Sequence, residues 1–224
     1  MKKTILAAFA ALVMMASCSQ TEKGFVINGT AEGIEDGDSV FLYEVSFNVE
    51  NNLISSAVVK DGQFLFKGEP MGAKLVALVA KHGDEPVAEQ SFIVEDDNVA
   101  VVLRPGSDAG TVEGGEEQRL WNMLNETIAK YMVQMDELSS QLNDSTLEEA
   151  KRNEIQQGVD SLSDELDRAA IQFIVDQMPS EFSNIALIPC SQIPSQEKLQ
   201  PLLDAFAEKQ PDASNYKKYM EENR

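Results

Sequence analysis

The chain has 224 residues, of which 43% are hydrophobic and 25% charged, as in an ordinary folded protein rather than a low-complexity or collagen-like one. Asp and Glu number 38 against 18 Lys and Arg, so the formal net charge is −20, which argues against binding to a nucleic-acid backbone. The single histidine, His82, excludes multi-histidine metal sites and disfavours Ser-His or Cys-His catalysis.

The N-terminus has the pattern of a bacterial lipoprotein signal. Lys2 and Lys3 precede an uncharged apolar stretch at residues 5–15, too short to span a bilayer, which needs about 20 residues. Small residues then precede Cys18, as in a lipobox. We expect residues 1–17 to be a signal peptide, Cys18 to carry lipid and residues 18–24 to form a tether. An ordinary signal peptide with an incidental cysteine is the alternative.

The residues after Cys18 bear on location. Ser19 stands where an Asp would resemble an inner-membrane retention signal, and no acidic run of the kind that resembles a surface-export signal follows. Loss of Lys2 and Lys3 with the signal would change the net charge from −20 to −22. We therefore expect a protein anchored in the bacterial outer membrane through lipid on Cys18 and facing the periplasm. Attachment on the cell surface is the alternative.

Residues 25–113 have the pattern of a β-sandwich domain. Short apolar stretches alternate with turn residues, and we expect strands at 25–27, 39–45, 53–59, 63–67, 74–80, 89–94 and 98–103. Asp61 and Gly62 separate two of these stretches, a spacing typical of a tight β-hairpin. The spacing of turns predicts an antiparallel sandwich or barrel, of which we favour the sandwich.

From residue 114 to 224 the hydrophobic spacing becomes helical. Residues 121–142 carry a heptad stripe and residues 155–173 carry a second stripe, which together predict an antiparallel helical hairpin. Ser145 and Glu148 fit a capping box for the second helix, and Pro179 should end it. Shorter helices should follow, with Pro189 interrupting one and Ser195 capping another. The fold class predicted is therefore α+β.

Several of these features together resemble a known family. They are the lipobox, the opening segment at residues 25–30, the turn at Asp61-Gly62, the strand at 92–95, Gly110-Thr111 and the helical stretch that follows. The chain resembles the DUF4369 family of Bacteroidetes lipoproteins. In many members this region precedes a thioredoxin-like domain with a redox C-x-x-C. This sequence contains no C-x-x-C, so we carry over no catalytic residue and expect no such domain in this chain.

Other candidate sites have a functional and a structural interpretation. Cys190 is either a reactive thiol or a small buried apolar residue, and we favour burial because no nearby cation would lower its pKa. We interpret His82 as an exposed residue of a turn rather than a metal ligand. The acidic turns at residues 35–38 and 95–98 lack the alternating pattern of a Ca²⁺ loop, so we expect them to shape turns.

The first helical stripe could also bind a protein partner. Trp121, Tyr131 and Met135 are the residues of that stripe best suited to the role, because methionine and aromatic side chains provide adaptable apolar surface. The alternative is core packing between the two arms of the hairpin, and we favour that alternative.

Three functions are compatible with the sequence. The first, which we favour, is a non-enzymatic envelope lipoprotein with a binding or scaffolding role through the sandwich or the helices. The second is an accessory to periplasmic thiol-disulfide exchange that partners a separate thioredoxin-like protein. The third is an enzyme acting on envelope glycans through paired carboxylates, which the 38 acidic residues would supply by chance anyway. We expect no cofactor, no metal ion and no catalytic grouping.

Overall fold

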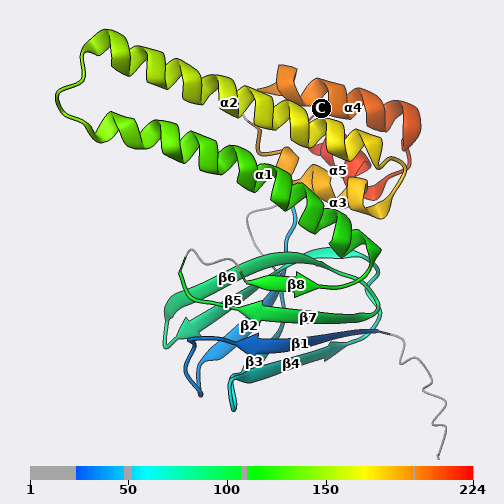
Figure 1. The fold of residues 1–224 in the computed structure, drawn as a ribbon. Helices are drawn as coiled ribbons and strands as arrows, with labels where there is room; N and C mark the ends of the chain where they lie inside the picture. The colour runs from blue at the N-terminus through cyan, green and yellow to red at the C-terminus, as the bar shows by residue number, and fades with distance from the viewer. Residues whose placement is uncertain (1–23, 48–51, 107–109, 194, 224) are drawn as a thin grey trace, which may run out of the picture.

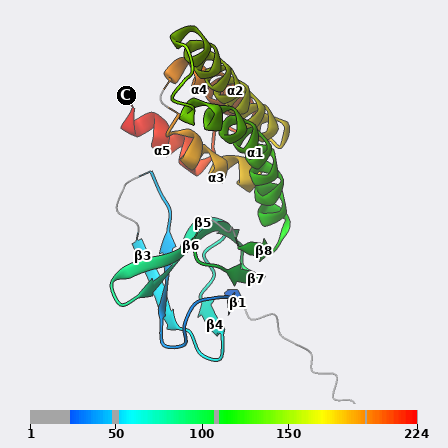
Figure 2. The same cartoon turned by 60° about the vertical axis from the view of Figure 1, so that its left-hand side comes forward.

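The computed structural model describes residues 24–47, 52–106, 110–193 and 195–223. The lipid-bearing candidate Cys18 and the expected signal peptide lie outside these residues. The described chain forms a β unit followed by a helical unit, which Figures 1 and 2 show stacked end to end. The predicted α+β class is confirmed.

Two four-stranded sheets make up the β unit. We call them sheet A, in the order β4-β1-β7-β8, and sheet B, in the order β3-β2-β5-β6. The strands are β1 (Phe25–Ala31), β2 (Ser39–Glu44), β3 (Asn52–Val58), β4 (Gln63–Gly68), β5 (Lys74–His82), β6 (Glu85–Val94), β7 (Asn98–Leu103) and β8 (Thr111–Glu113). Seven of them match predicted strands in place, and the short β8 was not predicted. A hydrophobic core lies between the sheets, with Ile27 and Leu103 from sheet A and Leu42 and Phe92 from sheet B all fully buried.

Strand pairing differs from the prediction in two places. The pairing of β1 with β7 is parallel, although every other pairing between the described strands is antiparallel. The predicted hairpin of β3 with β4 is wrong, because β3 pairs with β2 in sheet B while β4 pairs with β1 in sheet A. The chain crosses between the sheets at the turn.

The turn itself has the geometry that its sequence predicts. Asp61 and Gly62 adopt φ values of 52° and 68°, and the N–H groups of Lys60 and Gln63 each donate to the other's carbonyl, at 2.9 and 3.0 Å. The Asp36 carboxylate accepts from the backbone N–H of Asp61 and of Gly62, both at 2.9 Å. These bonds fix the turn against the loop between β1 and β2, while the strands beyond it separate.

Two long helices form the predicted antiparallel hairpin, and shorter helices pack beside it (Figure 1). The helical elements are α1 (Glu116–Ser140), the 3₁₀ turn η1 (Gln141–Asn143), α2 (Glu149–Asp176), α3 (Glu181–Cys190), α4 (Gln196–Lys209) and α5 (Ser214–Glu222). A second core joins α1–α5 and includes Ile174, Phe182, Leu202 and Phe206, all fully buried.

Helix caps follow the sequence at some ends and not at others. The Ser195 side chain accepts from the Lys198 N–H at 3.4 Å, as predicted. The capping box at Ser145 is wrong, because Asp144 accepts instead from both the N–H and the hydroxyl of Thr146, at 2.8 and 2.7 Å. That local turn delays α2 until Glu149. Pro189 does not interrupt its helix but lies in the last turn of α3.

Polar side chains at the start of α1 join the two units. The Glu95 carboxylate lies at the N-terminus of α1 and accepts from the Gln118 N–H at 3.4 Å. A Cβ at Gly115, the N-cap, would overlap this carboxylate, so glycine makes room for it. Glu117 in turn accepts from the Phe182 N–H at 2.6 Å, in the first turn of α3. Each carboxylate thus satisfies a helix terminus of another element.

Candidate functional site

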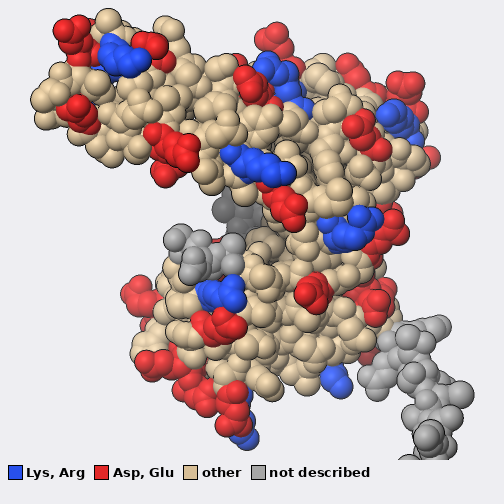
Figure 3. Space-filling model, in the orientation of Figure 1, with Lys and Arg blue, Asp and Glu red and all other residues tan. Residues whose placement is uncertain are grey.

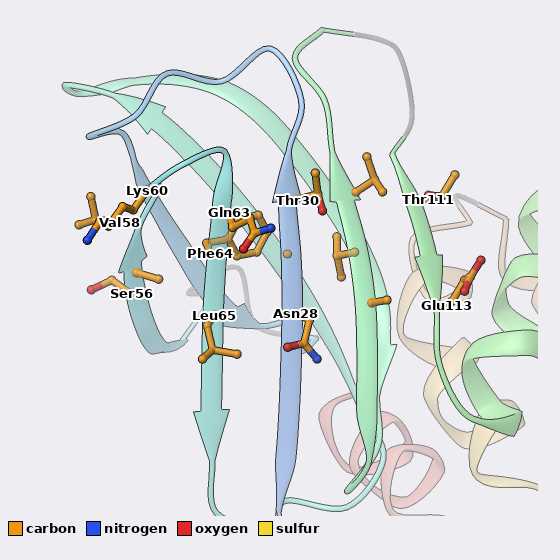
Figure 4. Close-up of a pocket in the computed structure, with 15 residues that line it drawn as sticks. Asn28, Thr30, Ser56, Val58, Lys60, Gln63, Phe64, Leu65, Thr111 and Glu113 are labelled. Carbon is orange, nitrogen blue, oxygen red and sulfur yellow. The ribbon is translucent and has the colours of Figure 1, made fainter. Parts of the chain in front are cut away.

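A shallow groove of about 910 Å³ crosses the outer face of sheet A and extends to β3 of sheet B (Figure 4). It exists because strand residues alternate between the core and the exterior. In β1, Phe25, Ile27 and Gly29 face the core, and Asn28 and Thr30 face outward into the groove. The neighbouring strands repeat this alternation, so five strands contribute side chains to one surface.

The lining is neutral and mostly small. Its polar side chains are amides and hydroxyls, from Asn28, Thr30, Ser56, Gln63 and Thr111. Of the described residues that line the groove, only Lys60 and Glu113 carry charge, and Figure 4 shows them on opposite sides of it. In Figure 3 this face of the β unit is largely tan, although the chain is strongly acidic.

Two exposed apolar side chains flank the polar ones. Val58 and Leu65 are 59% and 51% exposed. The Phe64 ring forms part of the floor between them, where it lies against Gly29, and a Cβ at Gly29 would overlap the ring. An open face with scattered donors, acceptors and apolar contacts suits a long ligand lying across it better than a small enclosed one.

The predicted partner-binding residues differ in their exposure. Trp121 is 7% exposed and belongs to the helical core, and its Nε1 has no hydrogen-bond partner among the described residues. This placement matches the core-packing interpretation of Trp121. Tyr131 and Met135 lie farther along α1 and are half-buried. Met132 and Val133, between them, are 54% and 57% exposed.

Cys190 is buried at the end of α3. Burial, together with the nearby Asp167 carboxylate, raises the pKa of its thiol to about 12. Because the thiolate is the reactive form, this placement agrees with a structural thiol.

His82 and the acidic turns make structural contacts. His82 is the last residue of β5 rather than part of a loop, and its Nδ1 lies 2.8 Å from Oδ1 of the buried Asp38. The hydrogen bond to Asp38 raises the pKa of His82, and the charges of Asp38 and Glu35 raise it further. In the second acidic turn, Asp96 accepts from the N–H of Met71 at 2.8 Å. Both turns therefore shape the backbone, as predicted.

Among the described residues, no three His, Cys, Asp or Glu side chains come together as a metal site would require. None of the helices that these residues form combines the length and the hydropathy that crossing a membrane demands.

The groove was not predicted from the sequence. Its outward residues are ordinary strand residues, and the alternation of polar Asn28 and Thr30 with buried neighbours was the one available signal. That alternation identifies an outer face, but it does not show that β3, β4, β1, β7 and β8 lie next to one another.

Comparison with known proteins identifies the β unit. Residues 25–121 match the family model described as a domain of unknown function, DUF4369. No curated protein matches the chain. A crystal structure of (S)-allantoin synthase is similar over 43% of this chain and 45% of that chain, with 12% identity and a TM-score of 0.31, a likeness too weak to support any inference. Through residues 25–121 the chain belongs to the DUF4369 family.

Proposed function

We propose that this chain is a membrane-anchored lipoprotein of the cell envelope with a non-catalytic binding role, and that the groove on sheet A is its binding surface. One observation carries the binding role. Five strands present neutral polar and exposed apolar side chains to a single hollow of about 910 Å³. Its two charged residues, Lys60 and Glu113, lie on opposite sides, so they do not form an acid–base pair (Figure 4).

The sequence before the β unit supports the anchor. Lys2, Lys3, the apolar residues 5–15 and Cys18 stand in the order of a lipoprotein signal. A tether from Cys18 to Gly24 would extend at most about 25 Å, at roughly 3.5 Å per residue. Such a tether would hold sheet A, which begins at Phe25, close to the outer membrane, on the side that we expect to face the periplasm.

Metabolic labelling tests the anchor. Cells that express the full chain are fed an alkyne-tagged fatty acid, and the purified protein is examined for the tag. We expect the wild type and Cys190→Ser to carry the label and Cys18→Ser to lack it. Cys190→Ser is the matched control because it removes the other cysteine. An unlabelled wild type, or a labelled Cys18→Ser, would contradict the anchor.

Photo-crosslinking in living cells tests the binding surface. A benzophenone amino acid replaces Leu65 in the groove or Met132 on α1, which are 51% and 54% exposed. We expect discrete crosslinked products from position 65 and none from position 132. Products from position 132 alone would transfer the binding role to the helices. The absence of products at both positions would contradict a binding role.

The accessory role in thiol-disulfide exchange remains a second prediction. Direct exchange through Cys190 is disfavoured because the thiol is buried and its pKa is raised to about 12. A thioredoxin-like protein among the products crosslinked at position 65 would favour this role, with the chain binding that protein but exchanging no disulfide with it.

A further inference from the structure

The strand β3 has an unpaired edge beside the groove. β3 pairs with β2 on one side. On its other side, no described strand forms a ladder with it, and the bridge between Lys60 and Gln63 is confined to the turn. Such an edge presents a row of backbone N–H and C=O groups without strand partners.

This edge lacks the side chains that usually prevent strand addition. The segment Asn52–Val58 contains no charged residue, proline or glycine, and its Leu53 and Val58 are 56% and 59% exposed. The other terminal strands are protected differently. β4 carries Lys67, β6 begins with Glu85 and Pro86, and β8 has three residues.

A bulge defines which part of β3 is available. The register places Leu42 opposite Ser55 and Tyr43 opposite Leu53, so Ile54 is an extra residue. The bulge interrupts the edge there and leaves Ser55 to Val58 as its regular part. Ser56, Ala57 and Val58 are also the β3 residues that line the groove, so open space adjoins this regular part.

These features select the chemistry of the occupant. An extended peptide backbone matches a row of alternating donors and acceptors at strand spacing. The pairing segment carries no charge, so neutral residues suit the paired positions. A second copy of the chain would bring one net charge of −20 against another, which favours a different partner with basic flanks.

We propose that residues 55–58 bind an extended, neutral segment of another protein by β-strand addition, with basic residues flanking the paired positions. This inference rests on the proposed binding role of the groove. The bound strand would continue sheet B beyond β3 and place alternate side chains against Val58 and Leu65.

A defined peptide tests the inference. The probe is a fluorescent peptide of alternating valine and threonine with lysines at both ends, added to the full-length lipoprotein in detergent. The control peptide has the same sequence and charge, but alternate backbone amides are methylated. We expect fluorescence anisotropy to show binding of the first peptide and a loss of about tenfold or more for the second, because methylation removes backbone donors.

Two valine variants locate the site. Val58→Lys places a protective charge on the edge, and we expect it to weaken binding by about tenfold. Val133→Lys on α1 is the matched control, since Val58 and Val133 are 59% and 57% exposed, and it should leave the affinity unchanged. The comparison of the two peptides uses the wild-type protein alone, so it remains a valid test even if Val58→Lys folds poorly.

Several results would overturn strand addition. They are equal binding of the two peptides, equal effects of the two variants, or no binding of the unmethylated peptide, because main-chain pairing requires no particular side chain. A dimer in sedimentation velocity that Val58→Lys abolishes would make a second copy the occupant instead. If position 65 forms crosslinked products but Val58→Lys leaves the affinity for the peptide unchanged, the proposed function stands and this inference alone is rejected.

Discussion

The side-chain oxygen Oε1 of Gln118 accepts a hydrogen bond from the backbone N–H of Ile93 at 2.7 Å, and Gln118 is 1% exposed. Its Nε2 donates to Oδ1 of Asn122 at 2.8 Å, and Asn122 donates to the Val112 carbonyl at 2.9 Å. Ile93 lies in β6 and Val112 in β8, the terminal strands of sheets B and A. The first turns of α1 therefore bond one backbone group on a terminal strand of each sheet.

Replacement of Gln118 by alanine should destabilise the protein. The Ile93 N–H would remain buried without its acceptor, an effect of about 1–3 kcal/mol. Urea unfolding followed by the fluorescence of Trp121, the single tryptophan, measures the change. Gln134→Ala, at an exposed position of the same helix, is the control. Equal midpoints for the two variants would show that the buried bond contributes nothing.

Glu117 should give the stability a pH dependence. Burial raises its pKa, while the hydrogen bond from the Phe182 N–H lowers it and the nearby charges of Glu95, Glu116 and Glu181 raise it. The native state therefore binds this proton more tightly than the unfolded state. Through this group, the free energy of unfolding falls as the pH rises from the ordinary glutamate pKa through the raised one.

Glu117→Gln isolates that contribution. The amide oxygen can still accept from the Phe182 N–H but has no charge to desolvate. We expect a flatter profile of urea midpoint against pH, and a stability near neutral pH at least equal to the wild type. Glu126→Gln on the exposed face of α1 controls for the loss of one negative charge. An unchanged profile would refute the prediction.

His82 should have an effect of the same sign in a higher range of pH. Its hydrogen bond to Asp38 is the main cause of its raised pKa. The stabilisation is complete below the ordinary histidine pKa of 6.5 and is lost as the pH rises through the raised value. The effect should be small, because the side chain is 65% exposed.

Nuclear magnetic resonance can follow the titration of His82 without ambiguity, because it is the single histidine of the chain. We expect its titration midpoint to shift down in Asp38→Asn. His82→Gln should remove the loss of melting temperature above pH 6.5. A wild-type midpoint at or below 6.5 would exclude the effect of Asp38.

Cys190 should resist alkylation in the folded protein. With its pKa raised to about 12, little thiolate exists at neutral pH, and burial blocks the reagent. We expect iodoacetamide to label the native protein slowly and the urea-unfolded protein quickly. Rapid labelling of the native protein would restore the reactive-thiol interpretation.

The sequence predicted features that depend on neighbouring residues. Asp61 and Gly62 marked a tight turn because that turn requires positive φ at both residues, and Ser195 marked a helix start. Seven strands and the helical hairpin followed from hydrophobic periodicity. Where two local preferences competed, the prediction failed, as at residues 144–148, where the Asp144 turn replaced the capping box.

Features that depend on distant residues were not predicted. The parallel pairing of β1 with β7 joins residues about 70 positions apart, and no local pattern specifies it. Gln118 reads as a polar helix residue until the Ile93 N–H lies beside it. The groove requires the order β4-β1-β7-β8, which the sequence of any one strand does not contain.

The hydrogen bonds of Gln118 and Asn122 have a consequence for where the β unit ends. A fragment that stopped at Glu113 would retain every strand of the described residues, but the Ile93 N–H and the Val112 carbonyl would lose their hydrogen-bond partners. The family match, which continues to Trp121, includes Gln118. The opening turns of α1 therefore belong structurally to the two sheets whose outermost backbone groups they bond.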